Sequence, residues 1–309
     1  MKKLTLLLVA AAAMVFSTAF AKTSHAVGAK KMKLTASAGW TMYSPKEGDS
    51  AQVFDIMGKG ASFGLGMTMA GPGGNAFTFL DSQVSGLSFA YGINDEMHVA
   101  LSLPIFNMTT GAEPNLKSLF GTAQLGFVFS KAMGSMDLTV NPYLNSPFAE
   151  MYFDDRTENG NFDQPLGFGL NLAIDSPEAS KIIWGFWMNF SMSLEKTKTK
   201  TMGEGAFKVD VKYGKGMFVN FVGIAGYKIN PLMAAKLHIY YDAPNLQAEG
   251  EGAPGFGEGN LSFKGVFDMA LAPNMGISAG LWYRMGLGDN NMLKDTTNLG
   301  LSVGYNMTF

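Results

Sequence analysis

Residues 182 to 194 read IIWGFWMNFSMSL, and this stretch decides the fold class of the chain. Every second residue from Ile182 onward is large and apolar, whereas most residues between them are small or polar, such as Gly185, Asn189 and Ser191. Successive side chains of a β-strand point to opposite faces. The stretch therefore predicts a strand with one apolar face and one mostly polar face.

The same alternation recurs along most of the chain, with clear examples beginning at Met97, Leu166, Met233 and Met275. Counted by this pattern and the turns between, the chain has about twelve strands. They are expected near 32–43, within 60–92, and near 97–106, 120–131, 136–145, 164–175, 181–195, 205–228, 232–242, 258–270, 275–286 and 297–309. The segments GASFGLGMTMA and AFTFL, within residues 51–82, leave about fourteen strands as the alternative.

Alternating strands also build soluble β-sandwiches, whose apolar faces turn inward. Three features favour a transmembrane up-and-down antiparallel barrel. The strands have about 10 or more residues, the length that a tilted strand needs to cross the hydrocarbon. Their polar faces carry Gly, Ser and Asn more than the charged residues of a solvated surface. The connections alternate between tight and long, as in barrels with short periplasmic turns and long outer loops.

The expected connections divide into two sets. Tight turns are expected at 92–95, 131–134, 175–178, 228–231 and 272–274, and outer loops near 107–119, 146–163, 195–204, 243–258 and 286–296. Residues 212–216, KYGKG, look like one more turn, but the apolar phase continues across them from Phe207 to Phe221. We therefore interpret 205–228 as one long strand that projects beyond the membrane, and the KTKTKT repeat of 196–201 as a hydrophilic outer loop.

The composition supports a membrane protein without helical spans. Charged residues are 16% of the chain, against about 25% in a typical soluble domain. No segment after the first 21 residues has the roughly 18 continuous apolar residues of a membrane helix, which leaves the closed barrel. The net charge of −2 argues against nucleic acid as a partner, and the absence of Cys excludes disulfides and thiolate metal sites.

The first 21 residues, MKKLTLLLVAAAAMVFSTAFA, combine a basic start, a short apolar run and an A-x-A end. This is the pattern of a secretory signal peptide. We expect residues 22–31 to be a periplasmic amino-terminal segment and residues 32–309 to form the barrel, with the outer membrane of a Gram-negative bacterium as its location. No Cys follows the expected cleavage site, which argues against a lipid anchor.

The chain ends LGLSVGYNMTF, in which apolar residues alternate with small or polar ones up to a final Phe. This end resembles the carboxy-terminal β-signal of outer-membrane barrels. The resemblance implies that Tyr305, Met307 and Phe309 are recognised by the barrel-assembly machinery.

Residues 91–104, YGINDEMHVALSLP, resemble the turn and following strand of outer-membrane channels linked to meta-pathway phenol degradation. The resemblance covers this one hairpin. It implies a channel that admits small hydrophobic or aromatic compounds.

If the apolar face contacts lipid, the other face lines the lumen. The candidate lumen residues are Trp187, Lys208, Asp210, Lys212, Lys236, His238, Tyr240, Asp242, Lys264, Asp268, Trp282 and Arg284, with Lys33, Asp137, Tyr143, Lys181 and Phe218 in the same phase. In one interpretation the charges form a constriction that selects solutes. In the other they pair across neighbouring strands and stiffen the interior, as Lys236, Lys264, Asp242 and Asp268 could.

Neither an enzyme nor a cofactor protein is predicted. Of the three histidines, His25 lies near the expected mature terminus, and His98 and His238 lie on lumen faces without an outward serine partner. The loop segment with Asp155, Asn159, Asn161 and Asp163 partly resembles a calcium loop, but its twelfth position is Leu166 instead of Glu. An acidic solvated loop without a metal is the favoured interpretation.

Two functions remain open on the sequence. The first is an outer-membrane pore for passive or selective uptake of small solutes. The alternative is a non-conducting barrel that acts as a surface structural or adhesive protein through its acidic loops. The two differ in whether the lumen is open.

Overall fold

The computed structural model describes residues 26–45, 61–64, 86–103, 105–108, 117–120, 123–146, 166–202, 207–213, 216–243, 246, 256–288 and 296–309. Strands make up most of these ranges, which also contain the 3-10 turn η2 (Phe256–Glu258). None of the helices within them is long and apolar enough to cross a membrane.

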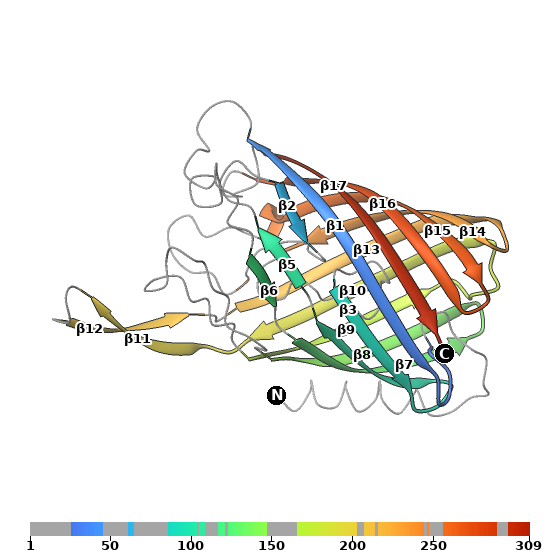
Figure 1. Cartoon of the computed structure of the whole chain (residues 1–309), viewed down its shortest axis with the longest axis horizontal. Coiled ribbons are helices and arrows are strands. Elements are labelled where there is room, and N and C mark those ends of the chain that lie inside the picture. Colours follow the sequence, from blue (N-terminus) through green and yellow to red (C-terminus); the bar gives the residue numbers. More distant parts are fainter. Residues whose placement is uncertain are drawn as a thin grey trace.

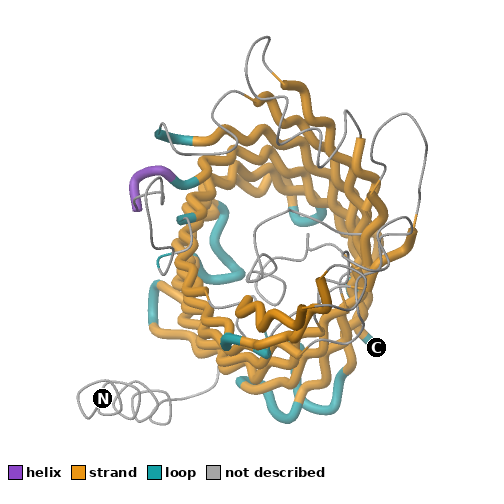
Figure 2. Tube along the Cα trace, turned by 90° about the vertical axis from the view of Figure 1, so that its left-hand side faces the viewer, coloured by secondary structure: helices purple, strands orange, loops and turns teal. Residues whose placement is uncertain are grey.

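Twelve antiparallel strands close into a ring, which confirms the predicted barrel and its lower strand number (Figures 1 and 2). In ring order they are β1 (Met32–Pro45), β3 (Gly86–Gly92), β4 (Met97–Leu103), β7 (Ala123–Met133), β8 (Met136–Ser146), β9 (Gly167–Asp175), β10 (Ile182–Ser193), β13 (Gly216–Asn230), β14 (Met233–Asp242), β15 (Asn260–Ala272), β16 (Met275–Gly286) and β17 (Thr296–Thr308). The first and last strands pair from Lys33↔Thr308 to Pro45↔Thr296, so the sheet has no free edge there.

The alternation of side chains separates the lipid face from the inner wall as expected. Along β10, Gly185, Trp187 and Asn189 are buried, whereas Trp184 and Phe186, which alternate with them, are exposed. Exposed apolar side chains cover the outside of the ring, and a closed barrel satisfies its backbone groups within the sheet. An apolar outer face of this kind is suited to hydrocarbon.

The tight turns lie together at one end of the barrel, beside the carboxy terminus (Figure 1). They connect β3 to β4, β7 to β8, β9 to β10, β13 to β14 and β15 to β16. Gly134, in the turn after β7, has a φ of 69°, which a residue without Cβ adopts readily. Short turns face the periplasm in bacterial barrels, so we assign this end to the periplasmic side.

The described part of residues 51–82 is one short strand that does not span the barrel wall. It is β2 (Ala61–Gly64), which pairs with Gly39–Met42 of β1. The neighbouring ring strand β3 pairs with β1 over Met32–Ser37. β3 and β2 therefore pair with successive parts of β1, and β2 is attached to the ring without crossing the membrane with it.

Of two predictions about residues 195–228, one was wrong and the other holds in part. The KTKTKT repeat is part of a strand, β11 (Lys196–Met202), which pairs with β12 (Phe207–Tyr213) in a separate hairpin that projects beyond the ring (Figure 1). β12 and β13 run in the same direction and register, since Lys196↔Tyr213 continues the ladder that ends at Ser193↔Gly216. Residues 205–228 thus follow one line beyond the ring, as predicted, but are divided into two strands of which only β13 belongs to the ring. A β-branched Thr at every second position favours extended structure, which accounts for β11. Between β4 and β7 in the chain, β5 (Ile105–Met108) and β6 (Lys117–Phe120) form a second small hairpin.

Candidate functional site

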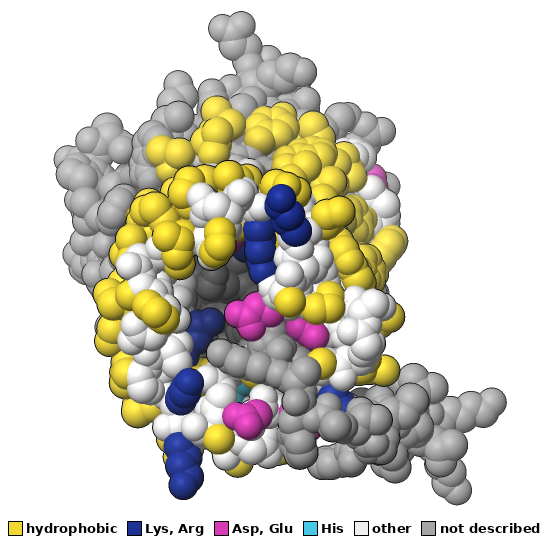
Figure 3. Space-filling view, turned by 90° about the vertical axis from the view of Figure 1, so that its right-hand side faces the viewer, with side chains coloured by type: hydrophobic (Ala, Val, Ile, Leu, Met, Phe, Trp, Pro, Cys, Tyr) yellow, Lys and Arg dark blue, Asp and Glu magenta, His cyan; other side chains and the backbone are white. Residues whose placement is uncertain are grey.

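The periplasmic mouth of the barrel is hollowed and lined by charge. Seen from that end, Lys or Arg and Asp or Glu side chains lie around the central hollow, while the outer rim is largely apolar (Figure 3). Charged groups inside an apolar cylinder make the inner wall the candidate functional site.

Nine of the twelve predicted lumen residues lie on ring strands in the inward phase. They are Trp187 on β10, Lys236, His238, Tyr240 and Asp242 on β14, Lys264 and Asp268 on β15, and Trp282 and Arg284 on β16. Leu237 and Ile239, which alternate with the β14 members, are exposed on the lipid side. Most of the nine are buried, whereas Lys236 and Asp268 keep 19% and 31% of their side-chain surface exposed.

The other three predicted lumen residues, Lys208, Asp210 and Lys212, lie on β12. This strand pairs with β11 in the projecting hairpin and belongs to a sheet separate from the ring. The continuous apolar phase across residues 207–221 suggested that the ring strand extended through them. The chain instead leaves the ring after β10 and re-enters it at Gly216, so these residues are placed off the wall.

Two pairs of opposite charges on the inner wall join different strands. Lys236 Nζ lies 2.7 Å from Asp268 Oδ2. Deeper in the wall, Arg284 Nη2 donates to Asp242 Oδ2 at 3.3 Å. A charged constriction would require unneutralised groups, so these two pairs support the interpretation that the charges stiffen the interior.

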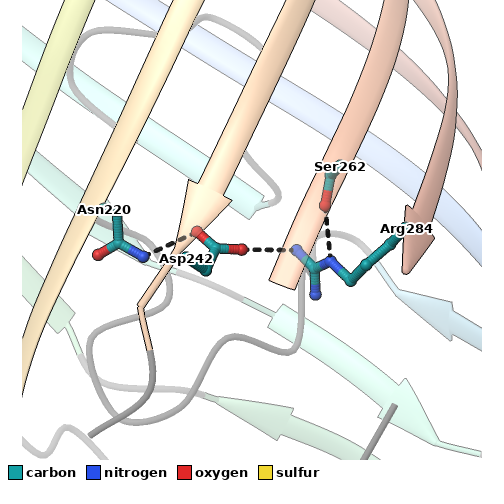
Figure 4. Close-up of polar contacts among 4 residues, drawn as sticks. All are labelled: Asn220, Asp242, Ser262 and Arg284. Carbon is teal, nitrogen blue, oxygen red and sulfur yellow. Dashed lines mark hydrogen bonds and ion pairs between the residues drawn. The ribbon is translucent and has the colours of Figure 1, made fainter. Parts of the chain in front are cut away.

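The Asp242–Arg284 pair is the centre of a polar cluster built from four consecutive ring strands (Figure 4). Asn220 Nδ2 on β13 donates to Asp242 Oδ1 at 2.7 Å, and Arg284 Nε donates to Ser262 Oγ at 3.0 Å. All four residues are buried. A buried ion pair needs such added hydrogen bonds to offset the cost of removing its charges from water.

The structure also reveals a feature that the sequence did not indicate, a row of amide side chains at one register. Its members, which we call the asparagine row, pair strand by strand as Asn141↔Asn171↔Asn189↔Asn220↔Asp242↔Asn260, from β8 to β15. Directly paired residues on neighbouring strands share one face of the sheet, so all six, including the one carboxylate, lie on the inner face together with the buried Asn141, Asn171 and Asn189. Asn189 Nδ2 donates to Asn171 Oδ1 and, at 2.7 Å, to Tyr143 Oη.

Several amide atoms of this row are buried without a hydrogen-bond partner from the protein. Asn141, Asn171 and Asn189 have no exposed surface. Both polar side-chain atoms of Asn141 are unpaired, as are Asn171 Nδ2, Asn189 Oδ1 and Asn220 Oδ1. Each unsatisfied buried group costs about 1–3 kcal/mol, and native structures contain few of them. Their concentration in one row distinguishes this part of the wall.

An apolar patch lies next to the asparagine row on the inner face, on its periplasmic side. It consists of Ala173, Trp187, Val222 and Ile224, with Ile183 and Tyr240 packed against them. Trp187 Nε1 donates to Asp175 Oδ1 at 2.7 Å, and Tyr240 Oη lies 2.9 Å from His238 Nδ1. The polar edges of both rings are therefore occupied, and the patch presents mainly apolar surface beside the amides.

The remaining predicted sites have different outcomes. The calcium-loop candidates Asp155, Asn159, Asn161 and Asp163 lie outside the described residues, as does the expected signal peptide. Among the described residues no group of three or more His, Cys, Asp or Glu side chains could hold a metal ion.

The residues of the predicted carboxy-terminal β-signal lie at the ring closure. Tyr305 and Met307 belong to β17, and the backbone of Phe309 exchanges two hydrogen bonds with Met32, at 2.8 and 2.9 Å. The side chain of Phe309 is 55% exposed. The last residue thus fixes the start of the first strand while its ring stays accessible on the outside.

No family model and no curated protein matches the sequence. Among solved structures, an outer membrane channel from Pseudomonas putida F1 matches with a TM-score of 0.58 at 11% identity, over 95% of this chain and 100% of that one. The NanC porin (TM-score 0.47, 8% identity, 89% and 98% covered) and the CymD monoaromatic hydrocarbon channel (0.42, 8%, 91% and 88%) match less well. The first likeness shows that this chain has the fold of an outer-membrane β-barrel channel.

Proposed function

We propose that the protein is an outer-membrane channel through which small solutes pass by way of the barrel lumen. The observation that carries this proposal is the closed ring of twelve strands, apolar outside and polar inside, with a hollowed, charge-lined periplasmic mouth. Twelve strands lie between the roughly eight whose interior is filled by side chains and the 16–18 that enclose an open aqueous channel. Passage is therefore restricted to small solutes.

The pairing of the inner charges favours uncharged solutes over ions. Asp242 is neutralised by Arg284 and Lys236 by Asp268, so these four groups together add no net charge to the wall. The resemblance of residues 91–104 implies small hydrophobic or aromatic compounds as the cargo. The apolar patch around Trp187 and Tyr240 supports a solute with an apolar or ring face.

The proposal includes the route by which the chain reaches the outer membrane. Residues 1–21 act as the signal peptide, and the assembly machinery recognises Tyr305, Met307 and Phe309. Exposure of the Phe309 ring at the end of the last strand supports that recognition. The protein has no catalytic role in this account.

A liposome-swelling assay tests the channel. The refolded mature chain is reconstituted into vesicles loaded with an impermeant polymer, which are then diluted into isosmotic solutions of neutral solutes of increasing size. A channel gives swelling rates that fall steeply as the solute becomes larger. Swelling no faster than that of protein-free vesicles for every solute would favour the alternative, a non-conducting surface protein.

A further inference from the structure

We propose that the asparagine row, together with the apolar patch beside it, is a binding site for an uncharged, hydroxyl-rich solute such as a sugar. The inference rests on the proposed channel function. Among uncharged solutes, it favours hydroxyl-rich ones over the hydrophobic or aromatic compounds that the resemblance of residues 91–104 implies. It concerns residues whose shared register no sequence motif indicates.

The unpaired atoms of the row form an array of donors and acceptors on neighbouring strands. Strands in a sheet lie about 4.8 Å apart, so registered side chains on adjacent strands are close enough for one small molecule to span several of them. Asn141 supplies a free donor and a free acceptor, Asn171 a donor, and Asn189 and Asn220 an acceptor each. A ligand that pairs with this array has to donate and accept hydrogen bonds at several points.

Hydroxyl groups fit the array better than ionic groups do. A hydroxyl both donates and accepts, whereas an ionised carboxylate accepts only and an ammonium donates only. Asp242, the single carboxylate of the row, is already bonded to Asn220 and Arg284. The row therefore has no unneutralised carboxylate with which to attract a cation, and its free donors are neutral amides mixed with acceptors, which do not favour an anion.

The neighbouring patch supplies the second half of the recognition. Ala173, Trp187, Val222 and Tyr240 share one register row, directly beside Asn171, Asn189, Asn220 and Asp242. A sugar ring has polar edges and faces of C–H groups, and this wall presents amides next to apolar surface. A solute that is apolar throughout would contact the patch and leave the amide atoms unpaired.

The unpaired amides have a cost in stability that a purely structural wall would avoid. Leu is close to Asn in shape, and apolar groups at these buried positions would remove the unsatisfied donors and acceptors. A bound ligand supplies the missing partners instead. Because Asn141, Asn171 and Asn189 have no exposed surface, binding requires a local opening of the wall, and we expect association to be slow.

Isothermal titration of the refolded, detergent-solubilised chain with D-glucose, and separately with toluene, tests the site. We compare the wild type with the double variant Asn141→Leu, Asn171→Leu and with Ser278→Ala, a control at a buried inner-wall position on β16 outside the row. We expect saturable D-glucose binding in the wild type and the control, at least tenfold weaker binding in the double variant, and no loss of toluene affinity in any variant. Asn141→Ala serves as a second row variant in case the double variant does not fold.

Two results would overturn the assignment: D-glucose affinity unchanged in the folded row variants, or toluene affinity reduced in them as much as glucose affinity. Absence of glucose binding in the wild type would likewise overturn it, since the amides would then have water as their partners. Planar-bilayer recordings on the same preparations separate the two proposals. Current steps without glucose binding would refute the site and keep the channel, whereas glucose binding without steps would refute the channel and keep the site.

Discussion

Replacement of Arg284 by Met should destabilise the barrel strongly, because it leaves the carboxylate of Asp242 buried with a single neutral partner. Arg284 and Asp242 keep 7% and 12% of their side-chain surface exposed, and 3.3 Å separates their Nη2 and Oδ2 atoms. Removal of one member of a buried pair typically costs about 3–5 kcal/mol. Asn220 still donates to Asp242 Oδ1 in the variant, so we expect a loss toward the lower end of that range.

The double variant Arg284→Met, Asp242→Leu separates the ion pair from simple packing. With both charges removed, no buried group is left uncompensated at the pair, and such replacements are often neutral or stabilising. We therefore expect the double variant to recover most of the loss of the single one. Urea unfolding in phospholipid vesicles, followed by tryptophan fluorescence, measures the free energy of unfolding of each protein.

A loss below about 1 kcal/mol in Arg284→Met would refute this reasoning, because that is the value of a solvent-exposed pair. The inner wall would then be wet at Arg284. A double variant no more stable than the single one would show in turn that packing of the Arg284 side chain, not its charge, supplies the stability.

Three further predictions concern other parts of the ring. Gly169→Ala should lower the free energy of unfolding by about 1–3 kcal/mol through overpacking, because the added Cβ would meet the ring of Tyr143. Gly223→Ala, which has open space around its Cβ, should be near neutral, and equal losses of stability in urea unfolding would contradict this packing. Leu281→Lys on the lipid face should lower the free energy of unfolding by about 2–4 kcal/mol, and Leu232→Lys in the periplasmic turn by about 0–1 kcal/mol. A larger loss in Leu232→Lys than in Leu281→Lys would contradict the placement of the membrane. Phe309→Ser should lower the heat-modifiable folded fraction recovered from outer membranes while the purified chain still refolds in detergent, and an unchanged fraction in membranes would argue against the β-signal.

The sequence predicted the strands and their faces because both follow from a period of two. The large apolar residues of the stretch from 182 to 194 sit outside in the structure, and Trp187 and Asn189 sit inside. The alternation of tight and long connections also placed the turns at one end correctly, since turn residues act locally.

The sequence did not predict the register between strands. Asn141 and Asn189 each lie on a polar face, yet nothing in their spacing shows that both align with Asn171. The pairing of Asp242 with Arg284 joins residues 42 positions apart on strands that are not neighbours in the ring. The stagger of the strands decides such contacts, and it depends on the whole ring.

The projecting β11–β12 hairpin shows a second limit of the sequence pattern, which concerns which strands belong to the ring. Phase continuity from Phe207 to Phe221 is real, but it describes two strands in line with each other, and only pairing partners show that β12 belongs to β11. Lys208, Asp210 and Lys212 were placed on the lumen for that reason.

Single-channel recording of the refolded chain in a planar bilayer shows whether this ring encloses a passage. Lys236→Glu provides the matched variant, because Lys236 lies on the inner wall with part of its side chain exposed. We expect discrete, stable current steps in the wild type and a shift of ion preference toward cations in the variant. A folded protein that gives no steps in either form would contradict the proposed channel.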